Sequence, residues 1–375
     1  MKTVISIVLN SFTNDSRVLK ENISLQNAGY DVKVVALHEE PLREFDEVQN
    51  ISVHRIKLKS RNWSKNKTIQ LFKYLEFVYR VVSQYNYAEV IHCNDLNTLP
   101  IGYIIKKFYN KNVKVVYDAH EYETEVNGLM GIHKNLAKKL EKFLIKRVDK
   151  TITVSDAIAN EYVKHYNIVK PALVLNTPPF QAVEKKDIFR RTFNIGEEKT
   201  IFLYQGGLSK GRGIEILLDT FKKAESIDSV IVFMGSGPLE RLVKEASTAY
   251  DNIYFHKAVA PNRLLEYTNS ADFGILFYEN SCLNHYYCSP NKMFEYLMAD
   301  LPVIVSNLYE MKRLVENNSI GVIAQENTPN GLKEAIEKAK KLNREELQKN
   351  IQRVKAIYNW EEQEKVLLNL YMDLK

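Results

Sequence analysis

Short apolar runs alternate with amphipathic helical patterns along almost the whole chain. In the first half the apolar runs are TVISIVL (3–9), DVKVVAL (31–37), EVIHC (89–93), VKVVYD (113–118) and KTITVS (150–155). In the second half they are TIFLYQ (200–205), SVIVFM (229–234), NIYFH (252–256), ADFGILF (271–277) and LPVIVS (301–306). Strands that alternate with helices predict parallel βαβ units, and therefore an α/β protein with doubly wound sheets.

The stretch Asn176-Thr-Pro-Pro-Phe interrupts this alternation near the middle of the chain. Because the residue before a proline is biased away from helix, we place a domain boundary here. The prediction is a domain over 1–177, a second domain over 178–355, and a last helical segment over 356–375. Open parallel sheets bind ligands beyond the carboxyl ends of their strands, so functional residues are expected just after strands.

Composition describes an ordinary globular protein. The 375 residues are 45% hydrophobic and 26% charged, and three cysteines are too few for a disulfide framework. The first apolar run ends at Asn10, which is too short for a secretory signal and fits a first strand. No run approaches the length of a membrane span. These features favour a cytoplasmic protein with reduced thiols.

The net charge of +6 is modest and favours an anionic ligand or membrane surface over nucleic acid, for which the sequence has no recognisable module. One segment, 61–77, mixes cations with aromatic residues: Arg61, Trp63, Lys65, Lys67, Phe72, Lys73 and Phe77. A second basic run over 134–150 surrounds Leu136, Leu140 and Phe143. Basic amphipathic helices of this kind bind anionic lipid, although crossover helices with solvated lysines remain the alternative.

A glycine-rich loop follows the run TIFLYQ and precedes a helical pattern. Its sequence, Gly206-Gly-Leu-Ser-Lys-Gly-Arg212-Gly213, is typical of a phosphate cradle, because glycines and helix N–H groups can approach an anion closely. Arg212 stands where a P-loop has lysine and Gly213 where it has the hydroxyl that binds magnesium, which argues against an NTPase. Gly235-Ser236-Gly237 is a second tight turn after a strand, and by itself it is a weak signal.

The most specific stretch is CSPNKMFEYLMADLPVIVSN, residues 288–307. Ser289 and Pro290 suit the N-cap and first position of a helix, and Pro302 ends it before a buried strand. Helical spacing predicts a core face made of Met293, Phe294, Leu297 and Met298. Lys292 and Glu295, three residues apart, then share the other face, where a solvated ion pair is the simplest interpretation.

Metal chemistry receives little support from the sequence. Cys282, His285 and Cys288 have a spacing that zinc could use, but no fourth ligand is evident. The chain also contains no Asp-x-Asp pair. We therefore assign no metal site, and a bound diphosphate would have to be neutralised by cations and helix termini.

Taken in order, these motifs resemble glycosyltransferase family 4, whose members have the GT-B fold. The resemblance runs almost end to end through Asp15-Ser-Arg17-Val18, Ile91-His92-Cys-Asn-Asp95, Val116-Tyr-Asp-Ala-His120-Glu121, Thr151-Ile-Thr-Val-Ser155, Asn176, Gly206-Gly-Leu, Arg212-Gly213, Gly235-Ser-Gly-Pro238 and Pro290-Asn-Lys-Met-Phe-Glu-Tyr296. It implies two Rossmann-like doubly wound domains facing a cleft, the first binding the acceptor and the second a nucleotide-sugar donor. The last helix would cross back to the first domain.

The resemblance also implies roles for individual residues. Donor contacts are expected from Gly206, Gly207, Arg212, Gly235, Ser236, Gly237, Ser289, Pro290, Asn291, Lys292 and Glu295. Arg212 and Lys292 would neutralise the diphosphate, and Glu295 would accept hydrogen bonds from the ribose hydroxyls. His120 would lie near the donor sugar and phosphate, so the expected catalytic residues are His120, Arg212 and Lys292, with a buried structural histidine as the alternative for His120. Acceptor contacts are expected from Asn14, Asp15, Arg17 and Asp95.

Two positions depart from the family pattern. Tyr287 stands where many members have a glutamate that contacts the donor sugar, which leaves the identity of the sugar open. Asp300 stands where many have glycine after the helix. Asp tolerates a left-handed conformation better than most residues, so the turn can survive.

The activity implied is transfer of a sugar from a UDP- or GDP-sugar to a hydroxyl of a saccharide or polyprenyl-linked saccharide, with retention of configuration. Cell-surface polysaccharide synthesis at the inner face of the plasma membrane would be its setting. No cofactor is expected to be required, and stimulation by Mg²⁺ is compatible with this. A GT-B-like nucleotide-sugar epimerase and a non-catalytic nucleotide- or sugar-binding protein are the alternatives.

Overall fold

The computed structural model describes residues 1–13, 15–223 and 228–374. The chain divides into an N-terminal unit, Met1–Val174 with Gln363–Lys375, and a C-terminal unit, Leu175–Glu362. The expected boundary after residue 177 falls close to the change of unit after Val174. The expected last segment over 356–375 is shared, since the chain returns to the N-terminal unit only at Gln363.

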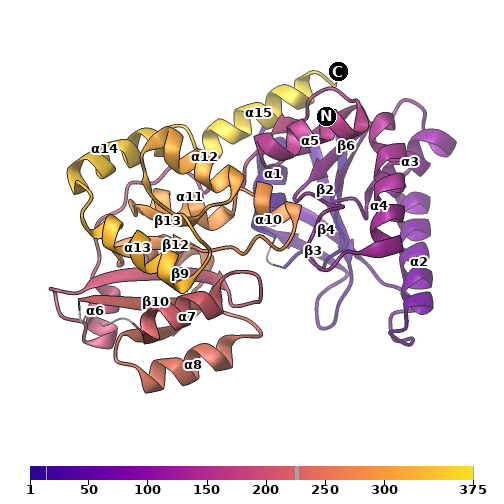
Figure 1. Ribbon diagram of the computed structural model, residues 1–375. Coiled ribbons are helices and arrows are strands. Elements are labelled where there is room, and N and C mark those ends of the chain that lie inside the picture. Colours follow the sequence, from indigo (N-terminus) through magenta and orange to yellow (C-terminus); the bar gives the residue numbers. More distant parts are fainter. Residues whose placement is uncertain (14, 224–227, 375) are drawn as a thin grey trace. The chain divides into compact units, whose positions relative to one another are not determined.

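The N-terminal unit is built on an eight-stranded sheet in the order β3-β4-β2-β1-β5-β6-β7-β8 (Figure 1). Its strands are β1 Thr3–Ile7, β2 Asp31–Leu37, β3 Phe45–Val48, β4 Ile51–Ile56, β5 Val90–Asn94, β6 Lys114–Ala119, β7 Lys150–Thr153 and β8 Ala172–Leu173. Its helices are α1 Ser16–Asn27, α2 Lys67–Tyr85, α3 Leu99–Ile104 with η1 Ile105–Tyr109, α4 Gly131–Leu144 with η2 Ile145–Arg147, α5 Asp156–Tyr166 and, from Gln363 on, the end of α15 Trp360–Met372.

The strands of this sheet pair in parallel except for the antiparallel hairpin β3–β4. Its turn residues Gln49 and Asn50 have φ angles of 49° and 67°, the left-handed conformation that two-residue hairpin turns require. Sequence analysis did not predict β3, β4 or β8, because these short strands lack a long apolar run.

The C-terminal unit has a six-stranded sheet, parallel throughout, in the order β11-β10-β9-β12-β13-β14. Its strands are β9 Thr200–Gly207, β10 Ser229–Ser236, β11 Ile253–Lys257, β12 Phe273–Leu276, β13 Val303–Ser306 and β14 Gly321–Ala324. Its helices are α6 Ile188–Phe193, α7 Ile214–Lys222, α8 Glu240–Ala249, η3 Pro261–Arg263, α9 Leu264–Thr268, α10 Leu283–Tyr287, α11 Asn291–Met298, α12 Tyr309–Asn318, α13 Pro329–Lys340 and α14 Arg344–Lys355.

Both faces of this second sheet are covered by apolar side chains. In β9, Ile201 and Leu203 belong to one buried cluster, while Phe202 and Tyr204 belong to the cluster on the opposite face. A strand buried on both sides is expected to be continuously apolar, which explains the unbroken runs in the sequence. The polar residues of these strands therefore stand mainly at the strand ends, such as Thr200 at the start of β9 and Ser306 at the end of β13.

Candidate active site

Helix α11 begins one residue later than the sequence suggested. The N-cap is Pro290 and the first helical residue is Asn291, so the prediction of Ser289 as N-cap is wrong. No side chain caps this helix start, whose backbone N–H groups carry the positive end of the helix dipole. At the other end Asp300 has a φ of 62° and its carboxylate accepts a hydrogen bond from Lys355 at 2.7 Å. The left-handed turn expected at Asp300 is confirmed.

Lys292 is the most unusual residue of this helix. Its side chain is buried, and its ammonium nitrogen has no hydrogen-bond partner within the described part of the chain. The nitrogen lies 4.1 Å from the centre of the Tyr204 ring and 5.5 Å from that of Tyr278. Burial, and then the positive charge of Arg212, lower the pKa of Lys292 to about 7, although Glu295 and Cys288 act in the opposite direction. The solvated ion pair that sequence alone favoured is therefore wrong for Lys292.

The glycine-rich loop lies directly beside this ammonium group. Gly206 has a φ of 106°, and a Cβ atom there would lie 3.6 Å from the Lys292 nitrogen. Gly206 and Gly207 end strand β9 and pair with Gly235 and Ser236 of β10, so these four residues extend the strands that were expected to stop before them. Gly206, Gly207, Ser236 and Gly237 are exposed. The result is an open backbone edge next to a buried cation.

Arg212 follows in the loop between β9 and α7. Its guanidinium donates to the hydroxyl of Tyr278 and lies 5.1 Å from the centre of that ring. The loop is fixed by Gly213, whose φ is 72° and whose missing Cβ would lie 1.9 Å from the Phe277 carbonyl oxygen. Only glycine fits such a position. Tyr278 thus contacts both cations of the site, a role that sequence analysis missed.

Glu295 is held in place from strand β9. The amide nitrogen of Gln205 donates to its carboxylate at 2.6 Å, and the amide oxygen of Gln205 accepts a hydrogen bond from Thr268 at 2.7 Å. This chain of contacts orients the carboxylate, which is partly exposed. Gln205 and Thr268 were also missed, since an amide at the end of an apolar strand has no distinguishing pattern.

Tyr287 is the last residue of α10 and is partly buried among aromatic rings. Its ring centre lies 5.0 Å from that of Tyr286 and 5.6 Å from that of Tyr309, which begins helix α12. Tyr309 follows strand β13, so the rule that functional residues follow strands could have identified it. Nearby, the thiols of Cys282 and Cys288 make helix-end contacts to the backbone of His285.

In the N-terminal unit, His120 lies between two carboxylates. Its Nε2 is 3.1 Å from Asp118 and its Nδ1 is 3.4 Å from Asp95. Burial lowers the pKa of His120, but Asp95 and Asp118 outweigh it and raise the pKa to about 10. The imidazole is therefore a cation at neutral pH. Asp95 has a φ of 64°, a strained conformation that often marks functional positions.

Behind His120 lies a buried ionic network. Arg17 contacts both oxygens of Asp118, the nearest at 2.8 Å, and lies 3.1 Å from Glu21. It also donates to the Val174 carbonyl at 2.7 Å. Arg17 is thus engaged inside the unit, and its role is to hold Asp118, which carries a pKa well below the usual range because Arg17 and His120 outweigh burial.

Two further residues were expected to contact the acceptor. Asp15 is the N-cap of α1 and accepts from the Val18 N–H at 3.3 Å and from Asn10 at 3.0 Å. Asn14 lies outside the described residues. Among the expected acceptor residues that are described, Asp95 is the one placed directly beside His120.

One group of side chains has the geometry of a metal site within the described ranges. Ligand atoms of Glu21, His92 and Asp118 lie within 4.8 Å of one another. The Arg17 guanidinium, however, stands between the two carboxylates at ion-pair distance. A cation is already supplied by the protein itself, so these residues fit an ionic network better than they fit a metal.

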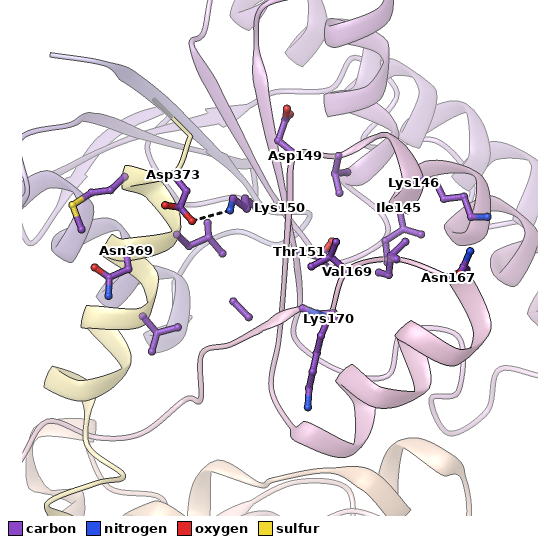
Figure 2. A pocket seen from close by; sticks show the side chains of 17 residues that line it. Ile145, Lys146, Asp149, Lys150, Thr151, Asn167, Val169, Lys170, Asn369 and Asp373 are labelled. Carbon is purple, nitrogen blue, oxygen red and sulfur yellow. Dashed lines mark hydrogen bonds and ion pairs between the residues drawn. The ribbon is translucent and has the colours of Figure 1, made fainter.

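A cavity of about 860 Å³ occurs elsewhere in the N-terminal unit. Figure 2 shows that it lies between α15 and the segment around β7, where Lys150 and Asp373 form an ion pair at 3.0 Å. Its lining residues Asp149, Lys150 and Ala172 stand at the starts of β7 and β8. The candidate residues follow the carboxyl ends of strands, whereas this cavity lies at the amino ends of β7 and β8. The cavity therefore does not belong to the candidate site.

Comparisons with known proteins agree with this fold. Residues 23–176 match the family described as Glycosyltransferase Family 4, and residues 185–356 match the one described as Glycosyl transferases group 1. An uncharacterized glycosyltransferase from Methanocaldococcus jannaschii is 22% identical over 326 residues, which cover 81% of this chain and 79% of the relative.

Solved structures show the same architecture. Sucrose-phosphate synthase from Thermosynechococcus elongatus has a TM-score of 0.82 at 17% identity and covers 100% of this chain and 99% of its own. Anabaena HepE, solved in complex with UDP and glucose, has a TM-score of 0.75 at 12% identity with the same coverage. Two parallel-sheet α/β units with these neighbours define the GT-B fold. The two family matches and the archaeal relative identify the chain as a glycosyltransferase. The chain belongs to family 4 of these enzymes.

None of the described helices is both long and apolar enough to cross a membrane.

Proposed function

We propose that the enzyme takes its sugar from a nucleoside-diphosphate sugar, UDP- or GDP-linked, bound to the C-terminal unit. The observation that carries this is the buried ammonium of Lys292, which lacks a hydrogen-bond partner in the described residues. Arg212 and the uncapped start of α11 add positive charge close to Lys292, and this charge attracts a diphosphate. Anabaena HepE with UDP-glucose and the E. coli trehalose-6-phosphate structure with UDP-2-fluoro glucose are solved neighbours that support a nucleotide-sugar donor.

The remaining donor contacts follow from the geometry at the strand ends. Glu295, oriented by Gln205, accepts hydrogen bonds from the ribose hydroxyls. The exposed backbone of Gly206, Gly207, Ser236 and Gly237 faces the phosphates, and buried Gly235 lets the two strand ends approach closely. Ser289, Pro290 and Asn291 lead into the helix start. Tyr287 and Tyr309 present aromatic faces and hydroxyls to the transferred sugar.

The reaction proceeds with retention at the anomeric carbon. The bond from that carbon to the phosphate oxygen breaks, and a bond to the acceptor hydroxyl oxygen forms on the same face. The hydroxyl proton passes to a phosphate oxygen of the departing nucleoside diphosphate. Lys292 and Arg212 stabilise the charge that grows on the leaving group, and His120 supplies a third positive charge. No protein-bound metal is required, and Mg²⁺ acts at most as a stimulant.

The acceptor is a hydroxyl of a saccharide or of a polyprenyl-linked saccharide, used to build a cell-surface polysaccharide. Asp95 contacts it from beside His120. The enzyme works as a peripheral protein on the inner face of the plasma membrane, which is where such a lipid-linked acceptor is found. The exposed cationic and aromatic residues within 61–77 and 134–150 support this location.

A thermal-shift panel of UDP- and GDP-sugars tests the donor proposal. A ligand at about 100 times its dissociation constant should stabilise the fold by about 2.7 kcal/mol, and the shift should persist in EDTA. Sugar transfer to an added acceptor separates a transferase from an epimerase, which consumes donor alone, and from a binding protein, which consumes none. Absence of any shift, or a shift and a turnover that vanish in EDTA and return only with manganese, would contradict the proposal.

Changing Tyr287 to glutamate should alter the preference among donor sugars more than the affinity for the nucleotide. The reason is that Tyr287, on α10, packs against Tyr286 and against Tyr309 of α12, whereas Glu295 and Lys292 hold the nucleotide from α11. Competition by free UDP or GDP should remain nearly constant, as measured by inhibition of turnover. The assignment of Tyr287 to the sugar fails when nucleotide inhibition weakens in step with donor use.

A further inference from the structure

Two helices of the N-terminal unit carry rows of exposed apolar side chains. On α2 the row consists of Leu71, Phe72, Leu75 and Tyr79, and on α4 it consists of Ile132, Leu136, Leu140 and Phe143. All eight are between 43% and 72% exposed. Their spacing places each set along one face of its helix. We call the two rows together the two-stripe surface.

The two rows belong to one region of the unit, because α2 and α4 both pack against α3. The opposite faces of the helices are buried through residues such as Phe77, Val81 and Leu144. Single exposed apolar residues are normal on any protein, but continuous rows of them mark a surface that binds another protein or a membrane. Trp63, just before α2, and Met130, just before α4, are also exposed and add to it.

The charges around the two rows indicate which kind of partner covers them. Lys139 and Lys142 are exposed on α4, and Lys65 and Lys67 are exposed at the start of α2. The acidic residue of α4 is Glu141, which is fully buried and accepts hydrogen bonds from three tyrosine hydroxyls. The outward charge of α4 is therefore wholly positive. Apolar rows flanked by lysines complement acyl chains and anionic headgroups.

The structure also revises which residues of 61–77 can reach lipid. Lys73 is buried, and its ammonium donates to the carbonyls of Arg61 and Trp63, both at 2.9 Å. Arg61 is paired with Glu39 at 3.1 Å. Phe77 is fully buried. Lys73 thus positions the loop that carries Trp63 and makes no contact with lipid itself.

We propose that the two-stripe surface docks on an anionic lipid bilayer. The apolar rows of α2 and α4 enter the interfacial zone, and Lys65, Lys67, Lys139 and Lys142 contact lipid phosphates. The proposal rests on the lipid-linked acceptor proposed above and names the surface that brings the enzyme to it.

Vesicle flotation of the full-length protein tests the proposal. Recovery with phosphatidylcholine vesicles containing phosphatidylglycerol should far exceed recovery with phosphatidylcholine alone. The double change Lys139→Gln with Lys142→Gln should weaken partitioning by roughly 30-fold, since each cation near such a surface contributes about a fivefold factor. The matched control, Lys333→Gln with Lys338→Gln on α13, removes the same charge from exposed positions elsewhere and should bind normally.

The apolar rows are tested separately. Leu136→Ser with Leu140→Ser should abolish recovery with anionic vesicles, whereas Ile357→Ser, at an exposed site outside the surface, should not. The chain has two tryptophans, exposed Trp63 and buried Trp360, so a blue shift of fluorescence on vesicles reports Trp63. That shift should disappear in Trp63→Phe.

Three results would overturn the docking surface. The first is equal recovery with neutral and anionic vesicles, and the second is normal binding by the Lys139 and Lys142 variant. The third is that vesicles recover no protein, while the protein self-associates in solution and Leu136→Ser with Leu140→Ser removes this self-association. The last would assign the surface to a second copy. The UDP-induced thermal shift of each variant separates the two proposals, because it tests the donor site and is independent of vesicles.

Discussion

Replacing Lys292 by methionine should stabilise the protein while slowing turnover at saturating donor by about a hundredfold. The ammonium is buried without a hydrogen-bond partner in the described chain, which costs free energy that a methionine of similar length does not. Removing it should raise the free energy of unfolding by on the order of 2–4 kcal/mol near neutral pH. Thermal melts and steady-state kinetics on the same preparation measure both effects.

The pH dependence of the stabilisation by Lys292→Met follows from the lowered pKa of Lys292. Between about 7 and 10.5 the folded protein binds fewer protons at Lys292 than the unfolded chain does, so wild-type stability rises with pH across that window. The stabilisation by Lys292→Met should therefore shrink as the pH rises toward 10.5. Donor binding should weaken as the pH rises above 7, because the diphosphate binds the protonated form of Lys292. Binding above pH 7 should therefore be accompanied by uptake of a proton.

Glu295→Gln is the matched comparison for this prediction. The diphosphate gains negative charge as the glycosidic bond breaks, whereas the ribose hydroxyls do not change, so Glu295→Gln should chiefly raise the Michaelis constant for donor. Arg212→Ala should resemble Lys292→Met in turnover. Saturated turnover that survives in both cation variants would remove their role at the leaving group, and a large loss of stability in Lys292→Met would mean that the ammonium is not an unsatisfied group.

The stability argument depends on what sequence could not predict about α11. Spacing alone predicted the helix, its core face and the strand that follows, because apolar periodicity is a local signal. It also placed Lys292 and Glu295 together on a solvated face. Lys292 is instead buried by the rings of Tyr204 and Tyr278, which lie on β9 and just after β12. Contacts between residues so distant in sequence leave no local pattern.

The same limit applies to the N-terminal unit. The motif around His120 was visible, but Asp118 beside it carried no assigned role, since a carboxylate on an apolar strand becomes meaningful only when Arg17 meets it 101 residues away. Likewise, Lys73 could not be distinguished from Lys65 or Lys67 until the fold buried it. Sequence therefore predicted most strands and their alternation with helices, and it missed the residues that hold each charged group in place.

Changing His120 to glutamine should slow turnover by about a hundredfold, because in the proposed reaction His120 supplies a positive charge at neutral pH. Its pKa of about 10 implies that turnover has no inflection from His120 near pH 6.5 and falls only as the pH approaches 10. The contribution of His120 to the free energy of unfolding depends on pH in the same direction. The pKa is raised, so the stabilisation is fully present below about 6.5 and is lost as the pH rises through about 10.

Asp95→Asn provides the sharper test of the same group. Asparagine tolerates the φ of 64° at this position, so the backbone should be preserved. Removing one of the two carboxylates lowers the pKa of His120, and the fall in turnover should move toward neutral pH. Burial, and then the neighbouring Asp95, raise the pKa of Glu123 well above its usual value, so Glu123 is a second group that responds to this change. Asp118→Asn is less informative because it would leave Arg17 without its buried partner, at a cost of about 3–5 kcal/mol. A pH profile of turnover for wild type, Asp95→Asn and His120→Gln decides the matter: an unmoved profile in Asp95→Asn would show that the charge on His120 does not control the reaction.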